Sequence, residues 1–81
     1  MSDISDIMSG SLAYLARNLK SYRAQLGLTQ VELAQKAGVN RSYLASIESE
    51  TQPNTSIKTV EKLAAALGVS IIDLLKGPTE R

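Results

Sequence analysis

Apolar residues recur at intervals of three and four along most of the chain, which is the spacing of one face of an α-helix. The first such stretch begins at Ser11 and closes at Gly27, a residue type that often ends a helix. Its repeating positions are Leu12, Leu15, Ala16, Leu19, Tyr22, Arg23 and Leu26. We therefore predict one long helix that serves as the scaffold for the helices downstream.

Two short amphipathic patterns then meet across a glycine within residues 28–49. The first begins at Thr29, whose hydroxyl can accept a backbone N–H while Glu32 reaches back, as in a capping box. It ends at Gly38, which lacks a Cβ and can adopt the left-handed conformation that terminates a helix. Because too few residues remain for a loop before the next pattern, the spacing predicts a helix-turn-helix over 29–49.

The second pattern predicts a short helix over 40–49. Asn40 is a good N-cap, and Leu44 and Ile47 turn inward. The face left toward solvent carries Arg41, Ser42, Tyr43, Ala45 and Ser46. An arginine can donate two hydrogen bonds to guanine O6 and N7 in the major groove, and hydroxyl groups can contact either type of base. A helical corner without nucleic-acid function is the competing interpretation.

Two more helices are predicted downstream. Ser56 can cap the first, which ends at Gly68 and whose inner face carries Ile57, Val60, Leu63, Ala64 and Leu67. Ser70 can cap the last, which stops at Gly77 and Pro78 and contains Ile71, Ile72, Leu74 and Leu75. This last helix holds more large aliphatic side chains than one face can bury. Either a partner covers the remainder, or the helix simply exposes apolar surface.

The predicted fold is all-α, a compact arrangement of five helices without strands or repeats. Residues 11–77 form the helix-turn-helix domain. Residues 1–10 form an N-terminal extension that is either flexible or a short helical turn, and residues 78–81 form a C-terminal tail.

Composition narrows the possible functions. The 81 residues include no cysteine and no histidine, which removes disulfides, redox chemistry and the usual zinc sites, so no metal and no cofactor is expected. There is no glycine-rich phosphate loop, and no base stands at a plausible spacing from Ser42, Ser46 or Ser49. We expect no enzyme activity. No apolar run is long enough to span a bilayer, and the acidic start is unlike a signal peptide, so a cytoplasmic location is expected.

Charge is distributed unevenly along the chain. The formal net charge is +1, which is low for a protein that binds nucleic acid without sequence preference. Residues 17–41 nevertheless carry +4, from Arg17, Lys20, Arg23, Lys36 and Arg41 against Glu32. The positive potential is therefore concentrated around the predicted motif.

Short motifs stand at regular separations from about Leu19 to Lys76: Arg23, Leu26-Gly27-Leu28-Thr29-Gln30, Glu32-Leu33-Ala34, Gly38, Ile47-Glu48, Leu63-Ala64 and Ala66-Leu67-Gly68-Val69-Ser70. Together they resemble the lambda-repressor-like helix-turn-helix family of the Cro/CI or XRE type, found in phage repressors and small bacterial regulators. The resemblance implies a sequence-specific regulator of transcription, a repressor, that reads double-stranded DNA with helix 40–49. It also implies a homodimer on a palindromic site, joined through Ile71, Ile72 and Leu75.

The resemblance, together with the polar residues exposed on helix 40–49 and in the loop after it, assigns roles to individual positions. The residues expected to contact bases are Arg41, Ser42, Tyr43 and Ser46. The residues expected to hydrogen-bond phosphates are Thr29, Gln30, Asn40, Gln52, Asn54 and Thr55. Arg23 and Glu48 match a pair that forms a buried ion pair in some relatives, and we expect the same structural role here.

One segment departs from the family pattern. Relatives usually have a glycine two residues after the glutamate that matches Glu48, followed by a basic residue, whereas this chain has Glu50 and Thr51. Glu50 places a negative charge near the expected path of the phosphates. The neutral donors of this loop attract phosphate only at short range, so we expect DNA binding to depend modestly on salt.

The sequence leaves two other functional classes open. The same fold could serve as a protein-interaction module, such as an antitoxin, or as the DNA-binding head of a larger ligand-sensing regulator. The sequence shows no obvious space for a sensor pocket, so any ligand would bind in another domain or at a dimer interface.

Overall fold

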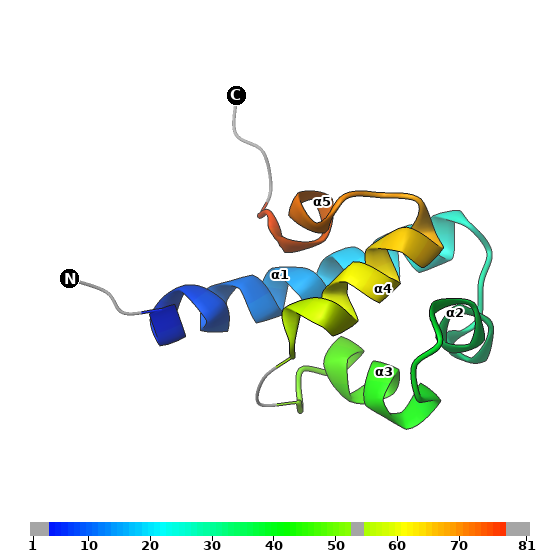
Figure 1. The fold of residues 1–81 in the computed structure, drawn as a ribbon, viewed down its shortest axis with the longest axis horizontal. Helices are drawn as coiled ribbons and strands as arrows, with labels where there is room; N and C mark the ends of the chain where they lie inside the picture. The colour runs from blue at the N-terminus through cyan, green and yellow to red at the C-terminus, as the bar shows by residue number, and fades with distance from the viewer. Residues whose placement is uncertain (1–3, 53–54, 78–81) are drawn as a thin grey trace.

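Five α-helices form the part of the chain that the computed structural model describes, residues 4–52 and 55–77, with side chains described from residue 13 onward (Figure 1). They are α1 (Ile4–Gln25), α2 (Gln30–Ala37), α3 (Arg41–Glu48), α4 (Ile57–Leu67) and α5 (Ile71–Leu75). No strand occurs within these residues. The prediction of an all-α fold with a helix-turn-helix is confirmed.

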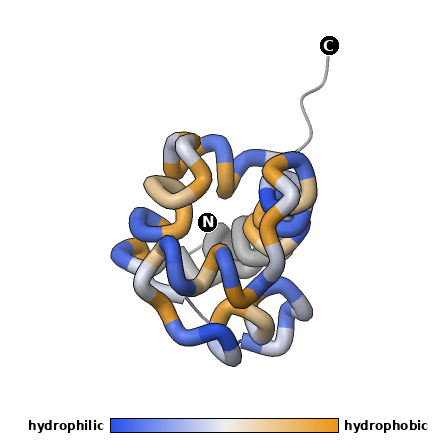
Figure 2. The backbone as a smooth tube through the Cα atoms, turned by 90° about the vertical axis from the view of Figure 1, so that its right-hand side faces the viewer, coloured by the Kyte–Doolittle hydropathy of each residue, from blue (hydrophilic) through white to orange (hydrophobic). Residues whose placement is uncertain are grey.

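The helices pack around one apolar core. α1 contacts α3 and α5, while α4 contacts α2 and α5, so each motif helix lies against one of the two longer helices. Every helix supplies at least one leucine without exposed surface: Leu15, Leu19, Leu33, Leu44, Leu63 and Leu74. Figure 2 shows the corresponding alternation of hydrophobic and hydrophilic positions along the backbone. Burying a side chain of this size contributes about 1.5–3 kcal/mol, so these leucines dominate the stability of the domain.

The helix ends follow the predicted signals. The Thr29 hydroxyl accepts the Glu32 N–H at 3.0 Å, and the Glu32 carboxylate accepts the Thr29 N–H at 2.8 Å, which completes the capping box of α2. Ser56 and Ser70 cap α4 and α5 in the predicted way. Gly27 lies in the left-handed region with φ 69°, where a residue with a Cβ would be strained. Local chemistry therefore fixes where most of the helices begin and end.

The first helix differs from its predicted extent. It begins at Ile4 rather than Ser11, and its first part extends past the other helices in Figure 1. No proline interrupts residues 4–10, and the one glycine there, Gly10, is tolerated within a helix at a cost of about 1 kcal/mol. The side chains of Ile4, Ile7 and Met8 lie outside the described part of the structure.

Two positions predicted on inner faces are exposed instead. Leu26 is 52% exposed because α1 ends at Gln25 and the chain turns away at Gly27. Ile57 is 54% exposed because it is the first residue of α4, whose buried stripe begins at Val60. At each of these helix ends, the helical spacing of apolar residues continues one position beyond the buried face.

The short α5 is held by α1. The Asn18 side-chain amide donates to the carbonyl oxygens of Leu74 and Lys76, at 2.8 and 2.9 Å. Gly77 lies directly against the Tyr14 ring, where an added Cβ would come within 2.6 Å of the ring carbon Cζ. These contacts fix the C-terminal end of α5 on the scaffold helix.

Within residues 4–52 and 55–77, no helix is long and apolar enough to cross a membrane. The same part of the chain contains no group of three acidic residues that could hold a metal ion.

Candidate nucleic-acid interface

The corner between α2 and α3 is short and sharply defined. Only residues 38–40 separate the two helices. Gly38 has φ 73°, and the next amide, that of Val39, donates to the Ala34 carbonyl at 2.9 Å, which satisfies the end of α2. Asn40 then accepts the Tyr43 N–H at 3.2 Å and starts α3. The residues from which the helix-turn-helix was predicted therefore end α2 and start α3 in the structure.

One side of α3 is locked in the core and the other faces solvent. Leu44, Ile47 and Glu48 are buried, whereas Arg41 and Ser42 are exposed. The remaining predicted base-contacting positions, Tyr43 and Ser46, are half-buried, together with Ala45. The N-terminal turn of α3 is therefore its most accessible part.

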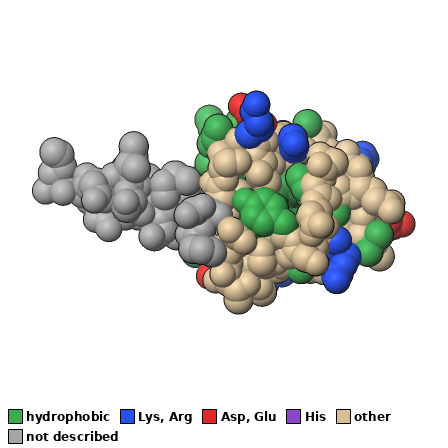
Figure 3. All heavy atoms as spheres, turned by 60° about the horizontal axis from the view of Figure 1, so that its bottom comes forward, with side chains coloured by type: hydrophobic (Ala, Val, Ile, Leu, Met, Phe, Trp, Pro, Cys, Tyr) green, Lys and Arg blue, Asp and Glu red, His purple; other side chains and the backbone are tan. Residues whose placement is uncertain are grey.

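Figure 3 shows the side of the molecule on which α3 lies. Much of this surface is uncharged, and most of the lysine and arginine side chains lie toward its margins. Positive charge therefore lies around a surface on which uncharged side chains, some of them hydrophobic, predominate.

An ion pair ties α1 to α3 beneath this surface. Arg23 Nε donates to Glu48 Oε2 and Arg23 Nη2 donates to Glu48 Oε1, each at 2.9 Å. The Glu48 side chain is only 3% exposed, and Arg23 Nη1 also donates to the Leu28 carbonyl at 3.0 Å. The hydrogen bonds from Arg23 to Glu48 raise the pKa of Arg23 above its ordinary value. The structure thus places Arg23 in the ion pair expected from the sequence.

Gln30 extends this pair toward the surface. Its amide nitrogen donates to Glu48 Oε1 at 3.1 Å, and its amide oxygen lies 3.5 Å from Arg41 Nη1. A polar chain therefore runs from the core to the exposed start of α3: Arg23, Glu48, Gln30 and Arg41. The sequence indicated a phosphate contact for Gln30 but gave no sign that it would link these charged residues.

The loop after α3 folds back onto Ser46. The Ser46 hydroxyl donates to the Tyr43 carbonyl at 2.7 Å and lies 3.1 Å from Gln52 Oε1. The backbone amides of Thr51 and Gln52 both donate to the Ser46 carbonyl. Ser46 therefore holds the loop, and its hydroxyl is already engaged within the protein rather than free for a base.

The other predicted phosphate contacts fall into three situations. The Thr29 hydroxyl is used in the capping box, whereas Asn40 is exposed and Gln52 is half-exposed near α3. Asn54 lies outside the described residues. Thr55 is only 4% exposed and its buried hydroxyl has no hydrogen-bond partner among the described residues, which argues against the predicted phosphate contact from that side chain. Loop position alone did not reveal this burial.

A separate groove of about 300 Å³ lies between α1 and residues 73–77. Its lining residues are Tyr14, Arg17, Asn18, Ser21, Tyr22, Gln25, Asp73, Lys76 and Gly77, none of which belongs to α2 or α3. The sequence gave no indication of this space because its two sides lie far apart along the chain. At its edge, hydrogen bonds from Ser70 lower the pKa of Asp73 below its ordinary value.

Comparison with known proteins gives consistent matches. The family described as "Helix-turn-helix" matches residues 19–74. The transcriptional regulator SinR of Bacillus subtilis is 48% identical over 61 residues, which cover 75% of this chain and 55% of SinR. The chain thus spans little more than half the length of this curated relative.

Solved structures agree with the fold. A hypothetical transcription factor from Neisseria superposes with a TM-score of 0.80 at 38% identity, over 84% of this chain and 77% of that chain. A crystal structure of SinR in complex with DNA superposes with a TM-score of 0.73 at 47% identity, over 76% of this chain and 98% of that chain. The similarity therefore covers all of the helix-turn-helix and most of the surrounding domain.

Proposed function

Because the chain belongs to the helix-turn-helix family, we propose that it binds specific sequences in double-stranded DNA and regulates transcription. The observation that carries this proposal is the placement of α3. Its inner face is fixed in the core by Leu44, Ile47 and the Glu48 ion pair, while its N-terminal turn presents Arg41 and Ser42 to solvent. A rigidly mounted helix with an exposed N-terminal turn suits the major groove, which is about 12 Å wide.

Base recognition is assigned mainly to Arg41. Its guanidinium can donate two hydrogen bonds to a guanine, and the Gln30 amide beside it favours one direction for the side chain. Ser42 is exposed next to it, and Tyr43 contributes through its partly exposed surface, whereas the Ser46 hydroxyl is engaged within the protein. We therefore expect each DNA half-site to contain a guanine opposite Arg41.

Phosphate contacts are assigned to the residues that flank α3 and begin α2. Asn40, Gln52 and the Gln30 amide group supply hydrogen bonds, and the free N–H groups of the first turns of α2 and α3 favour an anion. Such contacts fix the orientation of the protein on the duplex but carry no sequence information.

The proposed direction of regulation follows from occupation of the DNA by the protein. A domain bound over a promoter excludes other proteins from the same DNA, so we assign the chain a repressor role. The action requires neither a cofactor nor catalysis, and we place it in the cytoplasm, in contact with the cell's DNA.

The surface of α5 supports a homodimer. Ile72 is 71% exposed, the largest exposure among the described large hydrophobic residues, and Ile71 and Leu75 beside it are half-buried. Pairing two copies through this surface would bury it. If the two α3 helices then lie about 34 Å apart, they reach successive major grooves of a palindromic site.

Selection of binding sites from a random duplex pool tests the proposal. We expect enrichment of a palindromic sequence, and Arg41→Ala should weaken binding to the selected duplex by about 1–3 kcal/mol and relax the preference at one base pair. Lys58→Ala serves as the control because Lys58 is an exposed cation on α4. If no sequence is enriched at low salt, the chain acts instead as a protein-interaction module such as an antitoxin.

A further inference from the structure

The backbone at Glu50 is strained. Glu50 has φ 63°, and it is the single non-glycine residue with a positive φ in the described part of the chain. Side chains with a Cβ disfavour this left-handed region, which glycine and asparagine adopt more easily. A glutamate at this position therefore makes the turn in which it lies less stable than a glycine would.

The turn is held by the neighbours of Glu50. The amides of Thr51 and Gln52 donate to the Ser46 carbonyl at 3.0 and 3.2 Å, and the hydroxyls of Ser49 and Thr51 are 3.0 Å apart. Glu50 itself contributes only its backbone amide, which donates to the Ile47 carbonyl at 3.1 Å. Within the described residues its exposed carboxylate takes part in none of the side-chain hydrogen bonds or ion pairs that hold this loop.

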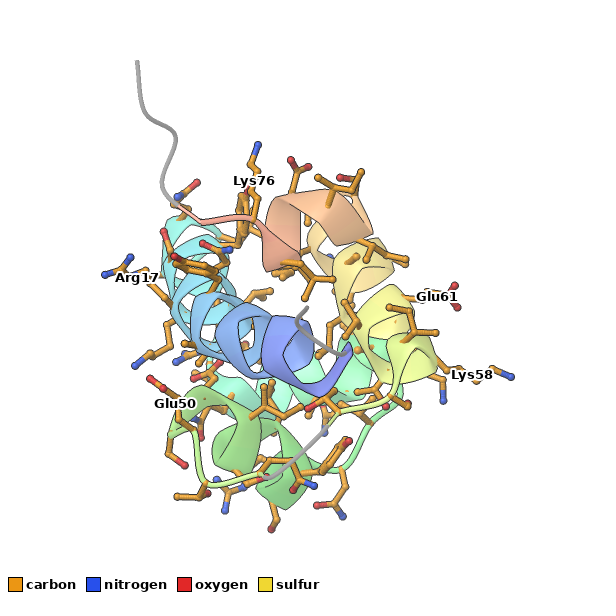
Figure 4. The ribbon with its side chains drawn as sticks, turned by 90° about the vertical axis from the view of Figure 1, so that its left-hand side faces the viewer. Arg17, Glu50, Lys58, Glu61 and Lys76 are labelled. Atoms are coloured by element: carbon orange, nitrogen blue, oxygen red, sulfur yellow. The ribbon has the colours of Figure 1, made fainter. Side chains whose placement is uncertain are left out.

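A residue that strains the fold and makes no compensating contact suggests a role outside folding. Glu50 directly follows the C-cap of α3 and lies two positions before Gln52, so its negative charge borders the surface assigned to DNA. Figure 4 shows Glu50 beside α3 on the same side of the molecule as Arg17, while Glu61 and Lys58 lie on the opposite side. Phosphates that approach the loop therefore meet this carboxylate.

We propose that Glu50 is a built-in attenuator of DNA binding, which repels the phosphate backbone and keeps the affinity of the domain low for every sequence. The inference rests on the DNA-binding function proposed above. Since the repelled group is the phosphate and not a base, the ratio between cognate and unrelated DNA stays the same. The attenuator thus sets how tightly the protein binds DNA without changing which sequence it prefers.

Glu50→Gln removes the charge and keeps the strained side chain. We expect this variant to bind both a duplex recovered by selection and an unrelated duplex of equal length about three- to tenfold more tightly at low salt. The gain should shrink at high salt because screening weakens the repulsion. Glu50→Gly also removes the strain, so it should raise the melting temperature as well, which Glu50→Gln should not.

Glu61→Gln is the matched control, because it removes the same charge from an exposed site on α4. Equal gains from Glu50→Gln and Glu61→Gln, or no gain from Glu50→Gln while the unmodified chain binds DNA, would overturn the attenuator and leave the proposed function intact. Failure of the unmodified chain to bind any duplex would overturn both.

Discussion

At the scale of single residues, polar side chains connect the core of the molecule to the exposed surface that is proposed to bind DNA. Arg23 and Glu48 form a two-point ion pair, and Gln30 links Glu48 to Arg41 at the surface. Buried charges of this kind add little net stability while both are present, but each depends on its partner. The orientation of Arg41 therefore depends on residues that lie beneath the recognition surface.

Glu48→Ala should destabilise the domain severely. The change leaves the Arg23 guanidinium partly buried without its carboxylate, which costs about 3–5 kcal/mol against a total stability of about 5–15 kcal/mol. For a domain of this size the melting temperature should fall by roughly 12 °C or more. Thermal unfolding followed by circular dichroism measures this fall. Glu61→Ala, at an exposed position, should melt like the unmodified chain; equal melting of all three proteins would show that the pair has no structural role.

The sequence predicted the ion pair but not the link made by Gln30. Arg23 and Glu48 stand at family positions, so the amino-acid sequence was enough to predict their pairing. The position of the Gln30 amide depends on how closely α2 and α3 approach, which no local pattern encodes. The burial of Thr55, which argues against its predicted phosphate contact, was likewise not evident from the local sequence.

At the scale of helices and turns, local chemistry accounts for most of the architecture. Capping residues mark the starts of α2, α3 and α4, and left-handed glycines mark the ends of α2 and α4, as predicted. Periodicity was less reliable at Ile57 and Leu26, because it cannot show where a helix passes beyond its neighbours. The helices could therefore be predicted well from the sequence, whereas the exposure of the side chains at their ends could not.

Asn40 allows the stability and the DNA binding of α3 to be separated. Aspartate caps helices as well as asparagine does, so Asn40→Asp should change stability by less than about 0.5 kcal/mol. The new negative charge at the start of α3 faces the phosphates and should weaken binding to the selected duplex by about tenfold or more. Asn40→Ala, which removes the cap, should instead cost about 1 kcal/mol of stability.

Circular dichroism and a binding titration on the two Asn40 variants measure these effects. Unchanged DNA affinity in a fully folded Asn40→Asp variant would show that the start of α3 does not approach the duplex.

At the scale of the whole molecule, the recognition surface and the proposed dimer surface belong to different helices. The side chains proposed to contact bases extend from α3, whereas the exposed apolar side chain Ile72 belongs to α5. α1 packs against both α3 and α5 and so holds them in a fixed position relative to each other. Two copies joined through α5 would therefore carry their α3 helices in one fixed relation.

Ile72→Glu tests the dimer. Placing a charge at the centre of an apolar contact makes pairing unfavourable, so sedimentation at micromolar concentration should shift from dimer toward monomer. The fold should be unaffected because Ile72 is 71% exposed in one copy. Val31→Glu, at another exposed apolar position on α2, is the control and should leave sedimentation unchanged. A monomeric unmodified chain, or a variant that sediments as a dimer, would rule out this interface.

Titrating the chain with its selected duplex while recording amide chemical shifts tests the central claim most directly. The account predicts that the largest chemical-shift changes fall within residues 29–52, centred on Arg41 and Ser42. In the Arg41→Ala variant these changes should be lost, and the amide shifts of residues outside 29–52 should stay as they are. Changes concentrated on α4, or on the groove between α1 and α5, with α3 unaffected, would contradict the account.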